Sequence, residues 1–494
     1  MGNKGQVTVF LCLVLLSLLI LGLTSVEMVR VSMGGARAAE AADGAAQEIK
    51  AAYNRRLFDE YHLLAVDRNF GGQGEGKMEE MAEDYLEYTF DGSDDYDMAV
   101  KSVELADCRG LLENDCENMK KQITEYMKIY IETEGIKDLL EMITTERKAG
   151  TDTKTTIDNG QEDERSTDSL WIGTDPRNVL KHTLRGGILK IVTPSGGEPS
   201  DASYSEEDLP SGSRNDADEK WTDIEFDDLD AFKKQLGNWD TVDETGVTDD
   251  FYGICYAIEM FNTYTSKKAE RPAECEVEYM IAGKDNDRDN LKGVVNRIIA
   301  HRLPVNLAYL LSDDSKMAAI DSIAFVLSLL PGVTYSAVKY LLAGCWAYAE
   351  TLADIRCMLC GNNVQFIKTS KTWKTDIDSL GDLLTMQNEN YEGADAIGYK
   401  GYLAILLAEK HNDIYYRMAD MIQLNLSQED ETFDMKNMIY GFSIDVDIEQ
   451  RKKFAPFIES FPEINGIDDG YYRHGFRIST VSYTHLRAHE TAAN

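Results

Sequence analysis

Three short segments combine residue types that could bind a ligand or carry out chemistry. Their patterns are those of a phosphate-binding loop, a calcium-binding loop and a redox-active cysteine pair. The residues concerned are 71–77 (GGQGEGK), the alternating acids Asp285, Asp287 and Asp289, and the CxxC pair Cys357 and Cys360. Each segment lacks a feature that its chemistry needs.

A phosphate-binding loop follows a strand and places Ser or Thr directly after Gly-Lys, because that hydroxyl holds magnesium. Met78 stands at this position, and the pattern predicts no strand before residue 71. We therefore expect a flexible loop at 71–77 and no bound nucleotide.

A calcium loop of this type places Gly at its sixth position and Glu at its twelfth. This chain has Asn290 and Asn296 there. Capping of a helix that begins near Leu291 explains the three acids better, and a loose cation site is the alternative. We assign no metal site.

A redox CxxC pair opens a helix, because the positive helix end lowers the thiol pKa. Cys357 and Cys360 end their predicted helix, with Gly361 as its C-terminal cap, and the negative end raises the thiol pKa. This position argues against redox catalysis. A structural disulfide and two buried thiols both remain as interpretations.

Other catalytic patterns do not emerge from the sequence. The chain has no Gly-x-Ser-x-Gly and no His-Glu-x-x-His, and its acids are too abundant for any pair to stand out. We therefore expect no enzyme, no catalytic residue and no cofactor.

The charge balance narrows the class of partner. With 87 acidic and 50 basic residues, the formal charge of -37 would repel nucleic acid phosphates, so we expect no nucleic acid partner. Such a charge is typical of a solvated surface protein. At 494 residues the chain is long enough for two or three domains.

The sequence predicts one membrane anchor. Residues 7–26 carry no charge, and about 20 residues at ~1.5 Å each span the ~30 Å hydrocarbon layer. Lys4 precedes them, so the positive-inside rule places the N-terminus in the cytoplasm and the bulk of the chain extracellularly or in the wall space. The rival is a secretory signal cleaved near residues 36–39.

Apolar residues continue at helical spacing from Val26 to Leu64, which predicts one long amphipathic helix beyond the membrane. Its Ala-rich seam, with Gly34, Gly35 and Gly44, permits close approach of another element. A partner helix and the protein's own globular part are equal candidates for that element.

The remaining patterns predict a mostly helical α+β fold. Helices are expected at 78–88, 109–148, 291–303, 305–311, 317–330 and 335–359, with another that Asp175 and Pro176 begin, and strands at 100–105, 275–281, 439–448 and 474–481. Charges inside the apolar helices favour buried core helices over a membrane hairpin.

The expected domains are an anchor (1–26), a long helix with a helical stalk (27–148), acidic linkers around one short helix (149–220) and an α+β domain (221–481). Residues 482–494 contain SYTHLRAHET, which resembles a translated sequencing adapter. We expect the fold to end near Val481.

The start of the chain, KGQVTVF with its apolar helix and Ala-rich extension, resembles the N-termini of TadE and TadG pseudopilins of tight-adherence pili. Gly5 and Val9 match that family, while Phe10 replaces its glutamate; the resemblance implies prepilin-type processing at Gly5. Three further segments resemble an uncharacterised Gram-positive family of unknown function met near such pilus loci: 52–67, 274–298 and 422–426.

These resemblances imply a membrane-anchored, extracytoplasmic structural or accessory component of a tight-adherence pilus or surface assembly. It would contact lipid through residues 7–26 and bind pilus or secretion proteins. The alternatives are an adhesin or sensor domain on the same tether and, third, an exported hydrolase.

Overall fold

The structure is a computed structural model that divides into two compact units. Unit 1 comprises Met1–Gln122 with Asp430–Asn494, and unit 2 comprises Ile123–Glu429. The structure describes residues 3–74, 76–91, 96–134, 174–205, 209–212, 251–329, 334–385, 388–393, 395–409, 414–454 and 470–481. The adapter-like residues 482–494 and the linker residues 149–173 and 213–220 lie outside this part.

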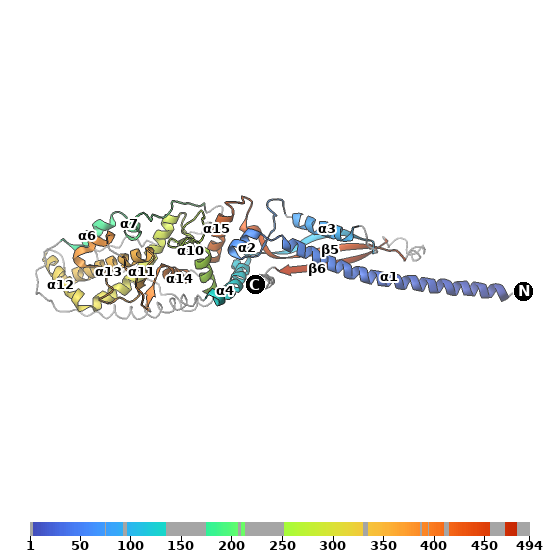
Figure 1. Cartoon of the computed structure of the whole chain (residues 1–494), viewed down its shortest axis with the longest axis horizontal. Coiled ribbons are helices and arrows are strands. Elements are labelled where there is room, and N and C mark those ends of the chain that lie inside the picture. The colour runs from blue at the N-terminus through green and yellow to red at the C-terminus, as the bar shows by residue number, and fades with distance from the viewer. Residues whose placement is uncertain are drawn as a thin grey trace. The chain divides into compact units, whose positions relative to one another are not determined.

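Unit 1 is built on α1 (Asn3–Ala51), a helix of 49 residues (Figure 1). Its first half is apolar and uncovered, and within the described residues α1 is the one helix long and apolar enough to cross a membrane. This composition fits a membrane span and a signal sequence equally. Its second half buries one face, formed by Ala38, Ala41, Ala42, Ala45, Ala46 and Ile49.

Four antiparallel strands form the sheet of unit 1, and β5 (Met438–Arg451) lies at its centre. β2 (Met98–Gly110) pairs along one edge of β5 and β6 (Tyr471–Val481) along the other, while β1 (Val66–Asp67) pairs with its first residues. The predicted strands at 100–105, 439–448 and 474–481 are therefore confirmed.

The two faces of β5 differ as the alternating sequence predicts. Phe442, Ile444, Val446 and Ile448 are buried in the core, whereas Asp445, Asp447 and Glu449 are less buried or exposed. On this polar side Arg477 of β6 lies 3.2 Å from Asp445 and 3.4 Å from Asp107 of β2. Cross-strand ion pairs thus cover the face that meets solvent.

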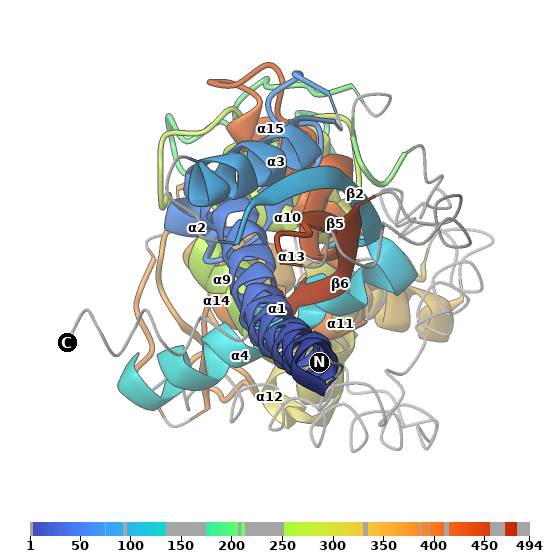
Figure 2. The same cartoon turned by 90° about the vertical axis from the view of Figure 1, so that its right-hand side faces the viewer.

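Two helices, α1 and α3 (Gly76–Phe90), lie together against the apolar face of this sheet (Figure 2). The small side chains of α1 allow this close packing: a Cβ atom added at Gly44 would lie 2.4 Å from the Tyr85 hydroxyl of α3. The Ala-rich seam therefore packs against the protein's own globular part, one of the two expected solutions.

The long helix ends earlier than its apolar pattern suggested. α1 stops at Ala51, and Asn54 caps a separate helix, α2 (Arg55–Tyr61), by accepting the Leu57 N–H. Asn is a strong N-cap residue, so it starts a new helix where the apolar spacing alone would continue the old one. Unit 1 also holds the short 3₁₀ helix η3 (Met435–Asn437).

After β2 the chain enters α4 (Glu113–Glu134), within which it passes from unit 1 to unit 2. The predicted helix at 109–148 thus begins later than expected, because residues 109 and 110 belong to β2. Residues 135–148 lie outside the described part.

The described part of unit 2 is mostly helical and holds one small two-stranded sheet, of β3 (Val364–Gln365) and β4 (Ala396–Ile397). Its described elements are α6 (Pro176–Leu184), α7 (Ile188–Val192), α9 (Phe251–Met260), α10 (Glu276–Ala282), α11 (Asp287–Ser312), α12 (Asp314–Leu327), α13 (Tyr335–Leu359), η2 (Ile377–Leu384), α14 (Tyr399–Glu409) and α15 (Ile414–Leu426). As predicted, Asp175 caps α6, and α13 spans 335–359 as a largely buried core helix.

Two secondary-structure predictions in unit 2 are wrong. The strand expected at 275–281 is instead helix α10, which Cys275 caps. The alternating Glu276 and Glu278 are as buried as their apolar neighbours, so their alternation does not mark a face that meets solvent. The helices expected at 291–303 and 305–311 are one helix, α11, which contains Pro304. The packing of α11 against its neighbours compensates for the backbone hydrogen bond that Pro304 cannot donate.

The compact units also differ from the expected domains 27–148 and 221–481. Strands β5 and β6 pair with β2, so the C-terminal strands belong to the unit that α1 begins. Strand pairing between distant segments is not encoded in local patterns.

Because the buried seam of α1 tolerates only small side chains, we expect Ala42→Leu to destabilise unit 1 by about 1–3 kcal/mol. Urea unfolding of the full chain in detergent would measure this. Ala36→Leu, the same change at an exposed position of α1, is the control and should change stability little. Equal effects of the two substitutions would contradict the packing described.

Candidate functional site

The motif-like segments singled out in the sequence serve local structure. In the loop at 71–77 the Asp67 carboxylate accepts the N–H groups of Asn69 (2.9 Å) and Gly71 (2.8 Å), and Lys77 pairs with Glu80 at 3.0 Å. The Asp67 carboxylate thus takes up the first backbone N–H group of this loop. Gly5, the implied processing position, lies at the start of α1, and its processing stays a prediction.

The acids at 285–289 surround the start of α11. Asn286 is the N-cap and accepts the Asp289 N–H at 2.9 Å, while buried Asp287 accepts the N–H groups of Glu274 (2.9 Å) and Cys275 (3.3 Å). Within the described residues, no three His, Cys, Asp or Glu side chains are grouped as metal ligands.

Cys357 and Cys360 lie at the C-terminal end of α13, as predicted, with Gly361 in the left-handed region (φ 84°). Both thiols are free. Cys357 Sγ donates to the carbonyl of Glu389 (3.2 Å), whereas Cys360 Sγ accepts from Asn388 (3.0 Å). Burial raises the pKa of the Cys360 thiol. The two thiols thus have different hydrogen-bond partners, and a disulfide between them stays a prediction.

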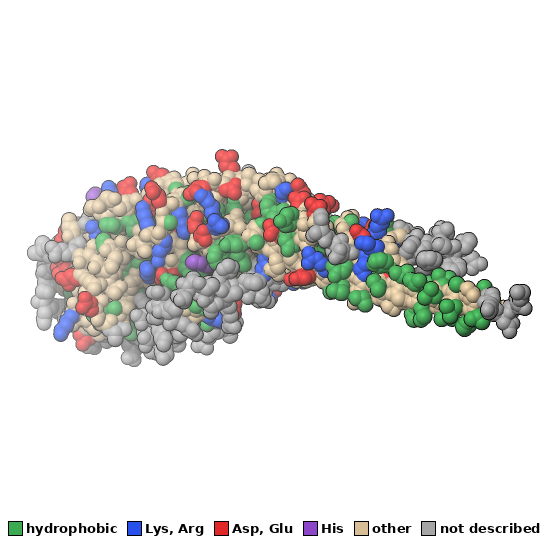
Figure 3. Space-filling view, turned by 45° about the vertical axis from the view of Figure 1, so that its right-hand side comes forward, with side chains coloured by type: hydrophobic (Ala, Val, Ile, Leu, Met, Phe, Trp, Pro, Cys, Tyr) green, Lys and Arg blue, Asp and Glu red, His purple; other side chains and the backbone are tan. Residues whose placement is uncertain are grey.

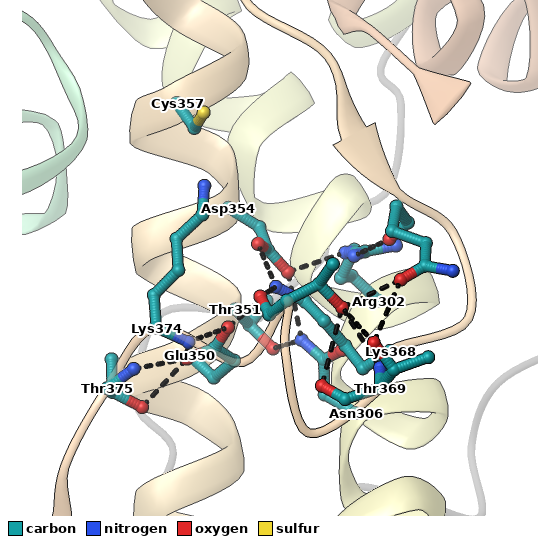
Figure 4. Close-up of polar contacts among 12 residues, drawn as sticks. Arg302, Asn306, Glu350, Thr351, Asp354, Cys357, Lys368, Thr369, Lys374 and Thr375 are labelled. Carbon is teal, nitrogen blue, oxygen red and sulfur yellow. Dashed lines mark hydrogen bonds and ion pairs between the residues drawn. The ribbon is translucent and has the colours of Figure 1, made fainter. Parts of the chain in front are cut away.

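A buried network of charges lies in unit 2, where α11, α13 and the segment after β3 meet (Figure 4). Arg302 and Asn306 are four residues apart on α11, as Glu350 and Asp354 are on α13, so each pair shares one helix face. Lys368 enters from the segment after β3. All five side chains are fully or almost fully buried.

Asp354 is the centre of this network. Its carboxylate lies 2.9 Å from Arg302 Nε and 2.6 Å from Lys368 Nζ, and it accepts a longer bond from Asn306 (3.3 Å). Burial by itself would raise the pKa of Asp354, but Arg302 and Lys368 together hold that pKa below its usual value. Asp354 is thus ionised in the folded protein.

Glu350 holds the segment after β3. It lies 2.6 Å from Lys368 Nζ and accepts the N–H groups of Lys374 (3.0 Å) and Thr375 (2.8 Å) and the Thr375 hydroxyl (2.8 Å). Lys374 also places a buried Nζ beside α13, and its charge helps to lower the pKa of Asp354. Three cations therefore accompany two carboxylates.

The network is arranged to hold structure. All four carboxylate oxygens of Glu350 and Asp354 accept hydrogen bonds from the chain itself, whereas a general base needs an oxygen within reach of a substrate. A cavity of about 630 Å³ in unit 2 is lined by other residues, among them Asn178, His182 and Lys190. The network thus joins two helices to a connecting segment.

Sequence reasoning did not find this network, although a signal was present. Glu350 and Asp354 are two of the charges inside the apolar helix at 335–359, and this pattern by itself argues only against a membrane hairpin. Polar residues spaced four apart in two apolar helices would have indicated a shared buried face. Lys368 could not have been assigned to it, because it lies in an irregular segment.

A second polar cluster surrounds α10. Glu276 accepts the Asn262 N–H (2.6 Å) and pairs with Arg271 (3.0 Å), while Glu278 accepts the Tyr264 N–H (2.9 Å) and the Tyr399 hydroxyl (2.8 Å). The second oxygen of Glu278, Oε2, is buried without a hydrogen-bond partner among the described residues. Burial raises the pKa of Glu278 to about 7.

In unit 1, a buried ion pair fixes α1 where its apolar segment ends. Glu27 and Arg30 lie 3.1 Å apart and are 3% and 8% exposed. Arg30 donates to the carbonyls of Tyr96 (2.7 Å) and Arg451, and Glu27 accepts the N–H groups of Lys453 and Phe454 (3.2 Å each). This pair binds α1, just after its apolar segment, to the end of the sheet.

These features define a mostly helical α+β protein with one apolar N-terminal helix and buried polar clusters in unit 2. The chain belongs to a family of unknown function, DUF5702, whose model matches residues 167–450, more than half of the chain. No curated protein and no solved structure matches it significantly.

Membership of a family of unknown function is therefore confirmed. The matched region contains two of the three segments on which that resemblance was based, 274–298 and 422–426, while 52–67 precedes it. It also contains both polar clusters of unit 2 and most of β5, whereas α1 lies outside it.

Removal of one partner leaves the other buried charges uncompensated, so we expect Asp354→Ala to cost about 3–5 kcal/mol of folding stability. Urea unfolding would measure the loss. Glu392→Ala, at an exposed acid of the same unit, should stay within about 0.5 kcal/mol of the parent. A cost below ~1 kcal/mol for Asp354→Ala would contradict the network.

The raised pKa of Glu278 predicts a pH dependence of stability. The folded protein holds this proton until about pH 7 and the unfolded chain loses it near pH 4.5, so stability falls as pH rises between these values. Glu278→Gln mimics the protonated form and should make the protein more stable than the parent at pH 8, by up to about 3 kcal/mol, but not at pH 4.5.

Unfolding at both pH values would check this prediction. The matched control is Glu274→Gln, since Glu274 is 37% exposed and pairs with Lys267 on the surface. This variant should keep the pH profile of the parent. A parent-like profile for Glu278→Gln would show that Glu278 is ionised in the folded state at neutral pH.

Proposed function

We propose that this protein is a membrane-anchored, extracytoplasmic structural or accessory component of a tight-adherence pilus or related surface assembly, acting by binding other proteins. In this proposal residues 7–26 span the membrane and Lys4 keeps the N-terminus in the cytoplasm. Both compact units then lie outside the cell, where a net charge of -37 keeps them solvated.

One observation carries the proposal: α1 is both the candidate anchor and a core element of unit 1. Its apolar window is uncovered, as a lipid-facing segment would be, while its second half packs against α3 and the sheet (Figure 1). A helix shared in this way transmits the position of the anchor directly to the folded unit.

The same observation favours an anchor over a cleaved signal. Cleavage near 36–39 would remove Glu27, Arg30 and Gly34 from unit 1. Glu27 and Arg30 make buried contacts to the end of the sheet, and Gly34 faces Gln450 of β5 so closely that an added Cβ would lie 2.6 Å from it. Their loss would leave buried polar groups without partners.

Two further points support binding in place of catalysis. The resemblance of KGQVTVF and the following helix to pseudopilin N-termini points to an assembly that is built on such helices. In addition, both carboxylate oxygens of Asp354 and of Glu276 accept hydrogen bonds from the chain itself.

The anchor is tested by fractionation of cells that express the full chain. We expect it to remain with membranes in alkaline carbonate and to be digested by external protease in wall-stripped cells. Leu15→Lys with Leu18→Lys places two charges at the centre of the span, each costing about 2.5–3.5 kcal/mol, and should prevent stable insertion. Lys120→Leu with Lys121→Leu is the control, outside the span.

Co-purification from cells that express the neighbouring pilus genes tests the partner. Recovery of pilus or secretion components supports the proposal. If the anchor holds but none is recovered, thermal shifts with glycans or cations would favour the adhesin or sensor alternative. Protection of both units from external protease would contradict the proposed topology and with it the whole proposal.

A further inference from the structure

The surface of α1 stays uncharged for longer than its apolar segment suggests. Between residues 6 and 36 the helix has two charged side chains, Glu27 and Arg30, and both are turned into unit 1. Met28, Val29 and Met33 are exposed by 75%, 58% and 54%. Arg37 is the first exposed charged residue after this stretch.

The uncharged stretch is longer than the hydrocarbon core of a membrane. About 30 helical residues at ~1.5 Å each extend ~45 Å, which matches a bilayer with its headgroup layers (about 40–45 Å) better than the ~30 Å hydrocarbon core alone. Lys4 and Arg37 then mark the two water boundaries. The turns from Glu27 to Gly35 lie at the depth of the outer headgroups.

The end of the sheet is fixed at this same depth. Arg30 and Glu27 bind the backbone of Tyr96, Arg451, Lys453 and Phe454, as described above. Gly35, one turn further along, faces His474 of β6, since an added Cβ would lie 3.3 Å from that ring. The start of β2, the end of β5 and the start of β6 therefore lie beside residues 27–35 of α1.

The composition of this end suits lipid headgroups. Arg451, Lys452 and Lys453 follow one another, and Lys452 Nζ lies 5.1 Å from the centre of the Tyr472 ring. Tyr471 is 40% exposed. Tyrosine and basic residues are the side chains that proteins place at membrane interfaces.

Five basic residues lie in the described part of this end, within residues 96–101, 449–454 and 470–473: Lys101, Arg451, Lys452, Lys453 and Arg473. Two acids lie among them. Asp97 pairs with Lys453 (3.7 Å), and Glu449 pairs with Lys101 (4.0 Å) and Arg473 (3.5 Å). Lys and Arg side chains are visible next to the apolar stretch of α1 in Figure 3.

We propose that this end of the sheet rests on the outer surface of the bilayer, with Tyr471, Tyr472 and Arg451–Lys453 contacting the phosphates of anionic lipids. The inference rests on the membrane anchor of the proposed function, but on none of its protein partners. It assigns a lipid-binding surface to unit 1, which would fix the orientation of that unit above the membrane.

Photo-cross-linking of the full chain in vesicles of phosphatidylcholine and phosphatidylglycerol tests this surface. The probe is p-benzoylphenylalanine in place of Tyr471, with mass spectrometry to detect lipid adducts. Arg477, six residues further along the same face of β6 and so ~20 Å away, is the matched control position. We expect adducts at 471 at several times the yield at 477.

Charge reversal tests the role of the basic residues. Lys452→Glu with Lys453→Glu should lower the adduct yield at 471 several-fold in these vesicles, whereas Lys120→Glu with Lys121→Glu, beyond the other end of β2, should not. The same probe at Leu15, which is 61% exposed, tests whether residues 7–26 lie in the bilayer.

The outcomes separate the two proposals. Adducts at Leu15 with equal or absent yields at 471 and 477 would overturn the headgroup contact and leave the anchor intact. Absence of adducts at Leu15 would overturn the anchor, and the headgroup contact with it. A yield at 471 that is unaffected by the Lys452 and Lys453 reversals would also count against the phosphate contacts.

Discussion

The close packing of α1 against α3 and the sheet is the contact on which unit 1 depends. Alanines at 38, 41, 42, 45 and 46 and glycine at 44 bring the helix near enough to bury Phe442, Ile444, Val446 and Ile448 of β5. Apolar burial of this kind contributes roughly 25 cal/mol per Å². A helix whose first half is uncovered is thereby fixed to a folded unit by its second half.

The Glu27–Arg30 pair also fixes α1 to the sheet, at the N-terminal end of this contact. A buried pair is costly unless its remaining hydrogen-bonding groups are satisfied. Here the backbone groups of Tyr96, Arg451, Lys453 and Phe454 satisfy them. The pair therefore fixes the register between the helix and the sheet, and it removes two charges from the outer surface of α1.

Unit 2 uses buried charge in another way. Its network around Asp354 connects α11 and α13 to the irregular segment after β3. Glu350 supplies acceptors for the backbone of Lys374 and Thr375, so that this segment can be buried without unsatisfied N–H groups. Around α10, Glu278 is instead kept protonated up to about pH 7 by its burial.

The sequence by itself determined the elements whose signals are local. The apolar run of α1, the helix α13 with its end at Cys360 and Gly361, the Asp175 cap and the strands β5 and β6 follow from spacing and capping residues, which act within a few positions of the chain. The family of unknown function was also expected from local segments.

Only the tertiary structure decided which distant segments meet. It paired β5 with β2 across more than 300 residues, made a helix of 276–282 by burying Glu276 and Glu278, and brought Lys368 to Asp354. Local patterns cannot specify such contacts, because a buried charge or strand edge finds its partner through the fold and not through its neighbours in sequence.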